Sequence, residues 1–303
     1  MENTVFHSGF VTLLGRSNVG KSTLTNALVG EKVSIVSDKP QTTRSQVRGV
    51  LTRPDYQLVF IDTPGVHKPR TRLGTYMVKA AHAAAGDVDC ILVVLDASAP
   101  MGGGDRAVLE EASKAKGAPV LAALNKIDLV PHEKLLLLMN QLQEYSFIQE
   151  ILPISARTGE GLEELERLLA ACLPEGPMYF PEDMYTDQSA RTLMAETVRE
   201  KALQLLREEI PHGIGVEIIE IKTRENGMMD IHADLYVERE SHKGIVVGKG
   251  GAMLRQIGTL ARADLEEALD CRINLQLYVR VKPGWRDSPT AMRDLGYDER
   301  QDF

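Results

Sequence analysis

Apolar runs of strand length alternate with amphipathic stretches over the first 173 residues. The clearest runs are Phe10–Leu14, Cys90–Leu95, Pro119–Leu124 and Ile151–Ile154. A run that is apolar at nearly every position is typical of a strand covered on both faces, as in a parallel sheet. This part of the chain is therefore predicted to be an α/β fold, a mostly parallel sheet with helices on both faces.

Two stretches depart from that pattern. Ser45–Thr52 and Tyr56–Ile61 flank Arg53-Pro54-Asp55, whose composition is typical of a tight turn. We expect the two stretches to form a hairpin. The sheet is then mixed, with an antiparallel strand at its edge.

A segment rich in proline and glycine follows the α/β pattern, at Pro174, Gly176, Pro177 and Pro181. The next helix is expected to end at 211–213, and its apolar face consists of Met194, Val198, Ala202 and Leu205. Two half-buried strands, a glycine-rich turn, further helices and a last strand come after it. This order predicts a second, small α+β domain.

The predicted organisation has four parts. Residues 1–173 form the first domain, 174–190 a linker, 191–287 the second domain, and 288–303 a charged tail that we expect to be loosely ordered. No apolar run approaches the length of a membrane span, and the first eight residues lack the basic and apolar regions of a signal peptide. A cytoplasmic location is expected.

Charge modifies this picture locally. The net charge of −8 disfavours indiscriminate nucleic-acid binding. However, two stretches, 241–263 and 271–286, contain basic residues and no acidic ones: Lys243, Lys249, Arg255 and Arg262, then Arg272, Arg280, Lys282 and Arg286. An unopposed basic stripe on an acidic chain predicts a channel for a polyanion, although a solvated surface is the plainer alternative.

The first candidate site follows the first strand. Gly15–Ser22 matches G-x-x-x-x-G-K-[ST], with a strand before it and a helix after it. Glycines let backbone N–H groups approach phosphate oxygens, Lys21 reaches the β- and γ-phosphates, and Ser22 is a Mg²⁺ ligand. The predicted nucleotide-binding residues here are Gly15, Arg16, Ser17, Asn18, Val19, Gly20, Lys21, Ser22 and Thr23.

Asp62-Thr63-Pro64-Gly65 follows the second strand of the hairpin. A carboxylate at this point is suited to hold Mg²⁺ through water, and the Gly65 N–H to approach the γ-phosphate. The predicted metal set is Ser22, Thr43 and Asp62; the choice of Thr43 over Thr42 stays open.

Base selection is predicted at the ends of two later strands. In Asn125-Lys126-Ile127-Asp128, the Asp128 carboxylate is suited to accept both N1–H and N2–H₂ of guanine, a donor pair that adenine lacks. Asn125 is expected to contact another edge of the base, and backbone N–H groups of Ser155, Ala156 and Arg157 to reach guanine O6. Standing alone, the first tetrad would be read as a loop with a helix-capping aspartate.

Together these motifs, in this order, resemble the nucleotide-binding domain of translation-factor-type GTPases. With Pro40-Gln41-Thr42-Thr43-Arg44 as a switch segment and Gly248–Gly251 in a second domain, the chain resembles the Era family of bacterial GTPases over residues 6–287. The resemblance implies a P-loop GTPase domain followed by a type II KH domain, with GTP, GDP and Mg²⁺ as ligands. It further implies binding to the 3′ region of 16S ribosomal RNA during small-subunit assembly, and peripheral membrane association. A monomer is expected.

Hydrolysis should differ from the Ras-like pattern, because Val66 stands where those enzymes carry a water-orienting glutamine. In the Era-like group a phosphate-loop asparagine, here Asn18, is associated with a bound K⁺ that replaces an arginine finger. The predicted catalytic residues are Lys21, Asn18 and Thr43, and Arg44 stays open as a finger in cis.

The G-x-x-G turn and the basic stripe favour single-stranded RNA as the second ligand. The predicted RNA-binding residues are Lys243, Gly248, Lys249, Gly250, Gly251, Arg255, Arg280 and Lys282. The rival hypothesis is a GTPase whose second domain binds a protein or an anionic membrane. A P-loop kinase of small molecules is disfavoured, since it has no use for guanine selectivity.

Overall fold

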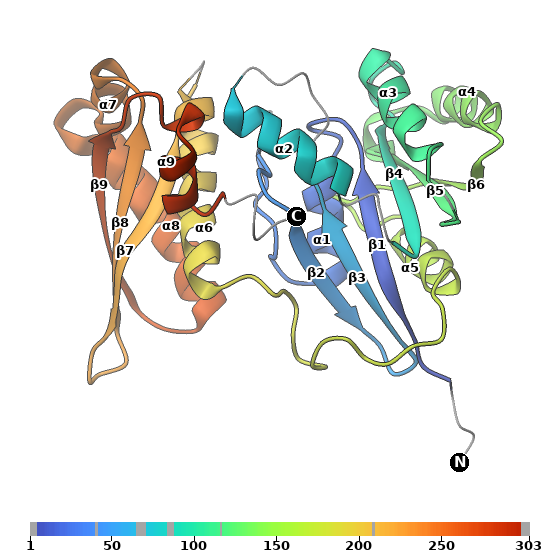
Figure 1. The fold of residues 1–303 in the computed structure, drawn as a ribbon, viewed down its shortest axis with the longest axis horizontal. Helices are drawn as coiled ribbons and strands as arrows, with labels where there is room; N and C mark the ends of the chain where they lie inside the picture. The colour runs from blue at the N-terminus through green and yellow to red at the C-terminus, as the bar shows by residue number, and fades with distance from the viewer. Residues whose placement is uncertain are drawn as a thin grey trace.

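The computed structural model describes residues 5–39, 42–64, 71–83, 88–115, 117–207 and 210–297. A six-stranded sheet in the order β2-β3-β1-β4-β5-β6 forms the first half of the molecule (Figure 1). Its strands are β1 (His7–Leu14), β2 (Val47–Thr52), β3 (Tyr56–Asp62), β4 (Cys90–Asp96), β5 (Val120–Asn125) and β6 (Ile148–Pro153).

Only β2 runs antiparallel in this sheet, and it pairs with β3 from Val47 opposite Asp62 to Thr52 opposite Gln57. The remaining neighbours are parallel. The predicted hairpin and edge strand are therefore confirmed. Parallel strands bring their carboxyl ends to one edge, so the loops after β1, β3, β4, β5 and β6 meet there.

Helices cover both faces of the sheet, as predicted. They are α1 (Lys21–Val29), α2 (Arg72–Ala83), α3 (Gly103–Ala112), α4 (His132–Gln143) and α5 (Leu162–Ala171). On one face, Leu24 and Leu28 of α1 share a buried core with Leu165 and Leu169 of α5. On the other, α3 and α4 bury their apolar stripes against β4 and β5.

A three-stranded sheet, β7 (Gly215–Thr223), β8 (Met229–Val237) and β9 (Ile273–Val281), forms the second half. The helices α6 (Ala190–Leu205), α7 (Glu240–Val247) and α8 (Ala252–Leu269) complete the predicted order of helix, two strands, two helices and strand. One expectation was wrong: α6 ends at Leu205, because Leu206 already has extended backbone (φ −91°, ψ 157°). Residues 211–213 form a separate 3₁₀ turn.

The Pro-rich segment between the halves is bound to the first sheet. Gln57 of β3 is fully buried, donates to the Phe180 carbonyl (2.8 Å) and accepts from the Tyr179 and Phe180 N–H groups. Further on, the Val50 N–H donates to Tyr185 O (2.8 Å), which covers part of the β2 edge. An edge strand covered in this way is protected from pairing with another chain.

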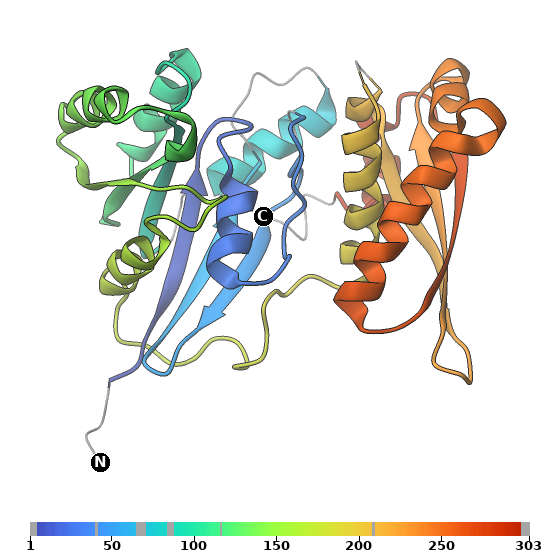
Figure 2. The same cartoon turned by 180° about the vertical axis from the view of Figure 1, so that it is seen from behind.

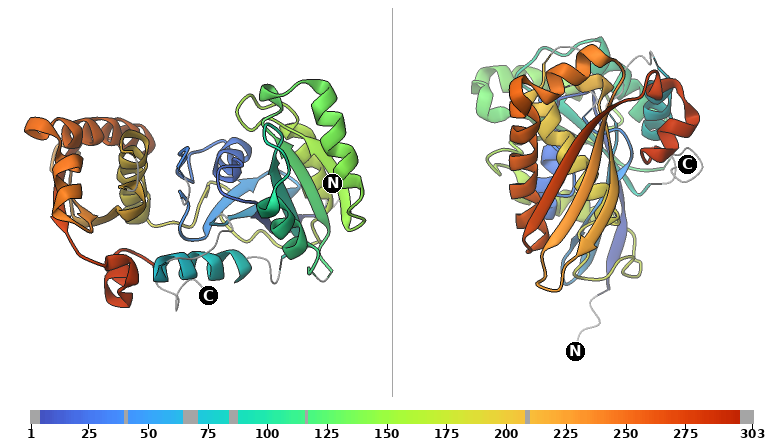
Figure 3. Two further views of the ribbon diagram at one scale, coloured as in Figure 1. Left: turned by 90° about the horizontal axis from the view of Figure 1, so that it is seen from above. Right: turned by 90° about the vertical axis from the view of Figure 1, so that its left-hand side faces the viewer.

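The expectation of a loosely ordered tail was wrong for residues 288–297. Ser288 caps α9 (Pro289–Asp294), whose Ala291 and Met292 are buried. They join Trp285 and Leu73, Tyr76 and Met77 of α2 in one apolar cluster. Figure 3 shows α9 beside α2 in the view from above. The prediction from composition missed this helix, because its few apolar residues are interspersed with charged ones. Within the described residues, no helix is long and apolar enough to cross a membrane.

Candidate nucleotide site and nucleic-acid groove

The shape of the phosphate loop requires its glycines. A Cβ on Gly15 would lie 2.6 Å from the Val94 carbonyl oxygen. Gly20 has φ 98°, and a Cβ there would lie 2.4 Å from Asn125 Nδ2. Asn18 also adopts a left-handed backbone (φ 66°), which asparagine tolerates better than most residues. The loop therefore packs directly against β4 and the start of the N-K-x-D segment.

Lys21 is buried at the foot of this loop. Its Nζ donates to the carbonyls of Gly15 (2.9 Å) and Arg16 (3.2 Å). Burial lowers the pKa of Lys21 to about 8, against the opposing charge of Asp62. An ammonium has three protons. Two are held by the loop, and the third is left for a phosphate oxygen.

The predicted metal residues lie together. Ser22 Oγ donates to Asp62 Oδ2 (2.7 Å), and Thr43 Oγ1 lies 2.9 Å from Ser22 Oγ. Asp62 is fully buried, its Oδ1 has no hydrogen-bond partner among the described residues, and burial raises its pKa. Two hydroxyls and a carboxylate with a free oxygen are hard donors of the kind that Mg²⁺ prefers. The residues fit the ion.

Asn125 ties three loops together. Its Nδ2 donates to Val19 O (2.8 Å), and its Oδ1 accepts from the N–H groups of Lys126 (2.8 Å) and Ala156 (2.9 Å). The contact of Asn125 with a base stays a prediction that rests on its second amide proton. The sequence missed this tie, although it placed Asn125 at the correct strand end.

Lys126 makes a second tie, donating from Nζ to Asn18 O (2.7 Å) and to Asp96 Oδ2 (2.7 Å). Asp96 was missed by sequence reasoning. The signal was available, since Asp96 ends β4 as Asp62 ends β3 and Asn125 ends β5. Polar residues at three neighbouring carboxyl ends indicate a site.

The remaining base-site residues are arranged around Asp128. This exposed carboxylate accepts from Ser155 Oγ at Oδ1 (2.7 Å), which leaves its other oxygen open. The N–H groups of Ser155 and Ala156 are already bonded to Glu160 O and Asn125 Oδ1. Of the three backbone donors predicted for guanine O6, only the Arg157 N–H has no partner among the described residues.

Other predicted residues have structural roles. Arg16 pairs with Asp105 (2.9 Å), and the buried Thr63 Oγ1 donates to Leu13 O (2.7 Å). Ser17 and Thr23 line the same pocket as Lys21 and Ser22. Pro64 is buried beside Thr63. Residues 40, 41, 65 and 66, which include Gly65 and Val66, lie outside the described residues.

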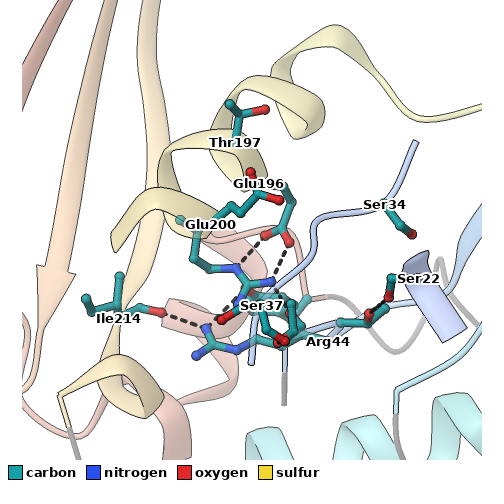
Figure 4. A network of polar contacts seen from close by, with 12 residues as sticks. Ser22, Ser34, Ser37, Arg44, Glu196, Thr197, Glu200 and Ile214 are labelled. Carbon is teal, nitrogen blue, oxygen red and sulfur yellow. Dashed lines mark hydrogen bonds and ion pairs between the residues drawn. The ribbon is translucent and has the colours of Figure 1, made fainter. Parts of the chain in front are cut away.

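Arg44 does not point to the phosphate site in this structure. It is 2% exposed and donates to the carbonyls of Ile214 (2.7 Å) and His212 (3.1 Å). Its guanidinium also lies over the rings of Trp285 (5.6 Å) and Tyr297 (5.9 Å). Figure 4 shows the guanidinium reaching Ile214 in the second half. Arg44 therefore connects the halves here and is not placed as an arginine finger.

Helix α6 carries a second connection. Arg199, fully buried, donates to the Thr42 carbonyl and pairs with Glu196 (2.5 Å). Glu200 accepts from the Val36 N–H (2.7 Å). Figure 2 shows the segment after α1 running beside α6. The charged face of α6, opposite its apolar face, is thus covered by residues near the metal site.

The second half has a groove of about 360 Å³ between α8 and β9. It is lined by Gly251, Leu254, Arg255, Gly258, Thr259, Arg262, Leu275 and Leu277. Of the predicted RNA-binding residues, Gly251 and Arg255 line the groove, and Gly248, Lys249 and Gly250 form the turn before it. Arg262 also lines the groove. It belongs to the basic stretch 241–263 but was not among the predicted RNA-binding residues. A Cβ on Gly258 would lie 3.3 Å from Leu277, so a larger residue there would crowd this side of the groove.

The prediction that the second basic stretch is unopposed was wrong. Arg280 pairs with Asp234 (2.5 Å), Lys282 with Asp294 (3.1 Å), and Arg286 with Glu238. These acids lie on β8, after β8 and on α9, so they are invisible in the local sequence. Lys243 on α7 is half-buried. Of the basic residues at the turn and the groove, Lys249, Arg255 and Arg262 have no ion pair among the described residues.

The fold and the site define a class of protein in which a P-loop nucleotide-binding domain is followed by a KH-like domain. A family model described as 50S ribosome-binding GTPase matches residues 10–126, and a KH domain model matches residues 209–286. GTPase Era of Clostridium novyi is 50% identical over 295 residues, covering 97% of this chain and 100% of that protein. GTPase Era of Clostridium kluyveri is 48% identical over 290 residues, covering 96% of this chain and 99% of its own.

Two solved structures agree over nearly the whole chain. Era in complex with MgGDPNP and nucleotides 1506–1542 of 16S ribosomal RNA has a TM-score of 0.93 at 41% identity, covering 97% of this chain and 99% of that one. A variant of Aquifex aeolicus Era bound to GDP·AlF₄⁻ has the same TM-score and identity, with 97% and 100% covered. The chain belongs to the Era family of GTPases.

Proposed function

We propose that this protein is a Mg²⁺-dependent GTPase that binds the 3′ region of 16S ribosomal RNA and assists assembly of the small ribosomal subunit. The observation that best supports a nucleotide-controlled switch is the set of contacts made by Thr42-Thr43-Arg44. These three residues contact α6, the metal carboxylate and the C-terminal cluster respectively. A ligand that moves Thr43 must therefore disturb both contacts with the RNA-binding half.

The nucleotide site divides its tasks among residues already held in place. Lys21 offers its third proton to the β- and γ-phosphates, and the Asp128 carboxylate is placed to accept from guanine N1 and N2. Ser22 and Thr43 would hold Mg²⁺ directly, and Asp62 would hold it through water. The bound ion supplies charge that neutralises the phosphates in the transition state. Asp128 would thus select guanine nucleotides, and Lys21 with the metal ligands would distinguish GTP from GDP at the γ-phosphate.

We further propose that residues 1–173 act as the nucleotide unit, 174–190 as a linker and 191–287 as the RNA-binding unit, in a cytoplasmic monomer. Lys249, Arg255 and Arg262 would contact phosphates, with the Gly248–Gly251 turn close to the RNA backbone. Arg280 and Lys282 are expected to contribute less to RNA binding, because each already forms an ion pair within the protein.

A role for K⁺ at Asn18 is part of the proposal. Asn18 Nδ2 donates to Asp38 O (2.6 Å), so its amide oxygen is free to turn toward a cation beside the phosphates. Turnover should rise when K⁺ replaces Na⁺, and Asn18→Ala should lose that response. Equal rates in both salts would remove this part of the proposal.

The test of the switch is a titration of single-stranded 16S 3′-region RNA against protein loaded with GDP or a non-hydrolysable GTP analogue, at fixed salt. We expect about tenfold tighter RNA binding with the analogue, a coupling of about 1.4 kcal/mol. Anionic vesicles form a second arm of the experiment. Equal RNA affinity in both states would refute the switch, and vesicle binding without RNA binding would favour a surface-docking GTPase.

A further inference from the structure

The two oxygens of the Asp62 carboxylate have different surroundings. Oδ2 accepts from Ser22 (2.7 Å) and Ser34 (2.9 Å), with Thr43 further away (3.4 Å). Oδ1 is buried and has no partner among the described residues. Three hydroxyls gathered at one oxygen favour a single orientation of the carboxylate. Oδ2 is the oxygen that lies beside Ser22 and Thr43, the two predicted metal ligands.

The three hydroxyls at Oδ2 are not equivalent. Ser22 and Thr43 line the nucleotide pocket and would turn their oxygens to the metal. Ser34 is 3% exposed and is not among the residues that line this pocket, so its hydroxyl is not placed to turn to the metal or the nucleotide. Ser34 is therefore the donor left to hold the carboxylate when Ser22 and Thr43 turn to the metal.

The backbone of Ser34 is itself held by one side chain. Asn26, one turn beyond Ser22 on α1, accepts from the N–H groups of Ser34 (2.8 Å) and Val33 (3.0 Å) at Oδ1. Its Nδ2 donates to the Ser34 carbonyl (2.7 Å). A side-chain amide that bonds both the N–H and the C=O of one residue leaves that residue little freedom.

The flanks of Ser34 are anchored on the second half of the molecule. Lys32 Nζ pairs with Glu200 (2.5 Å) and Asp264 (2.6 Å), and the Val36 N–H donates to Glu200 Oε1 (2.7 Å). In Figure 4 the chain carrying Ser34 passes between Ser22 and the α6 side chains. The hydroxyl is thus presented from a segment fixed on both sides.

We propose that Ser34 is a positioning residue of the Mg²⁺ site: its hydroxyl, on a backbone held by Asn26, donates to Asp62 Oδ2 and fixes the orientation of the carboxylate beside Ser22 and Thr43. The proposal rests on the proposed function, because it concerns the same metal. Groups that orient metal ligands commonly change metal affinity 10–100-fold when they are removed. Ser34 should therefore act on metal-dependent nucleotide retention, without contacting nucleotide.

The experiment measures release of a fluorescent GDP analogue from the full-length protein at buffered free Mg²⁺, from EDTA to 10 mM. For Ser34→Ala we expect about a tenfold higher Mg²⁺ concentration for half-maximal retention, with release in EDTA unchanged within about twofold. Ser34→Thr keeps the hydroxyl and should restore most of the Mg²⁺ response. Thr197→Ala, which removes a buried hydroxyl bonded to Leu193 O in α6, is the matched control and should leave it unchanged.

The results of this experiment distinguish the positioning role of Ser34 from the proposed function of the protein. An unchanged Mg²⁺ midpoint in Ser34→Ala would overturn the positioning role, and so would an equal acceleration of release in EDTA and in Mg²⁺, which indicates a general structural role. If circular dichroism shows that Ser34→Ala is unfolded, Ser34→Cys replaces it in the experiment. The cysteine keeps a side chain of similar size but donates only a weak hydrogen bond. Release from the wild-type protein that ignores Mg²⁺ would instead refute the proposed function itself.

Discussion

The predicted nucleotide site and the groove that we propose for RNA are built in opposite ways. In the nucleotide site the polar side chains bind other groups of the protein, as the Asn125 amide binds backbone groups of Val19, Lys126 and Ala156. In the groove, Arg255 and Arg262 are exposed, and no ion pair of either is seen among the described residues. The first site is a network of buried polar groups, and the second is an open, charged surface.

This difference predicts different responses to mutation. Buried polar groups that share partners lose more than one interaction when one member is removed, because the others are left unsatisfied. Exposed cations that contact phosphates act nearly independently and are screened by salt. Substitutions should therefore be severe and non-additive in the nucleotide site, and mild and additive in the groove.

The largest effect is expected for Asn125→Ala. It removes the acceptor of two N–H groups and the donor to Val19 O, each worth about 1 kcal/mol, or about 3 kcal/mol in total. The loss lowers the free energy of unfolding, so the nucleotide-free protein should melt at lower temperature, and GTP affinity should fall because the loops around the base are no longer held together. Fluorescent-nucleotide titration and thermal unfolding measure the two. Asn140→Ala, an exposed asparagine on α4, is the control; equal behaviour of both variants would contradict the network.

Asp128→Asn should have the next largest effect. Its exposed carboxylate offers one free oxygen to guanine, so the amide loses a charge-assisted acceptor worth about 2–3 kcal/mol. GTP should bind more weakly while xanthosine triphosphate improves, because xanthine presents an acceptor in place of the 2-amino group. Competition binding with both nucleotides gives the ratio. An unaltered preference for GTP would remove Asp128 from base recognition, and RNA affinity in the nucleotide-free protein should not change.

Sequence and structure agree where one residue's surroundings are set by its neighbours in the chain. The phosphate loop is such a case, since Gly15 and Gly20 are required by the turn between β1 and α1. The hairpin and the buried strands were predicted for the same reason. The motifs of the base site were also placed at the correct strand ends.

What the sequence missed depends on residues distant along the chain. Arg44 is bound by carbonyls and rings some 170 to 250 positions away, so its role as a link had no local signal. The acids that pair with Arg280, Lys282 and Arg286 lie on other elements. The polar face of α6 is buried only because the first half of the molecule covers it. Such pairings follow from tertiary packing.

Arg44→Ala tests the connection between the two regions. It deletes two hydrogen bonds to carbonyls and the contact with Trp285, so the preference of the RNA-binding half for one nucleotide state should weaken by about 1 kcal/mol, roughly fivefold. The ratio of RNA affinities between the GTP-analogue and GDP states should fall from about ten to about two. Arg48→Ala, which removes an exposed ion pair between β2 and Asp187 of the linker, is the control and should keep the ratio. A full ratio in Arg44→Ala would place the coupling elsewhere.

The smallest effect is expected in the groove, and it sharpens the comparison most. Arg255 lines the groove on the exposed face of α8, whereas Lys282 pairs with Asp294 and lies over the Tyr236 ring (5.2 Å). Arg255→Ala should weaken RNA binding severalfold and lower the slope of log affinity against log salt by about 0.7, one phosphate contact on a single strand. Lys282→Ala should leave that slope nearly unchanged, because its charge is already neutralised within the protein. Binding isotherms at four salt concentrations measure both slopes. Equal losses for the two variants would mean that RNA displaces Asp294 from Lys282, and that the groove, like the nucleotide site, exchanges internal partners for its ligand.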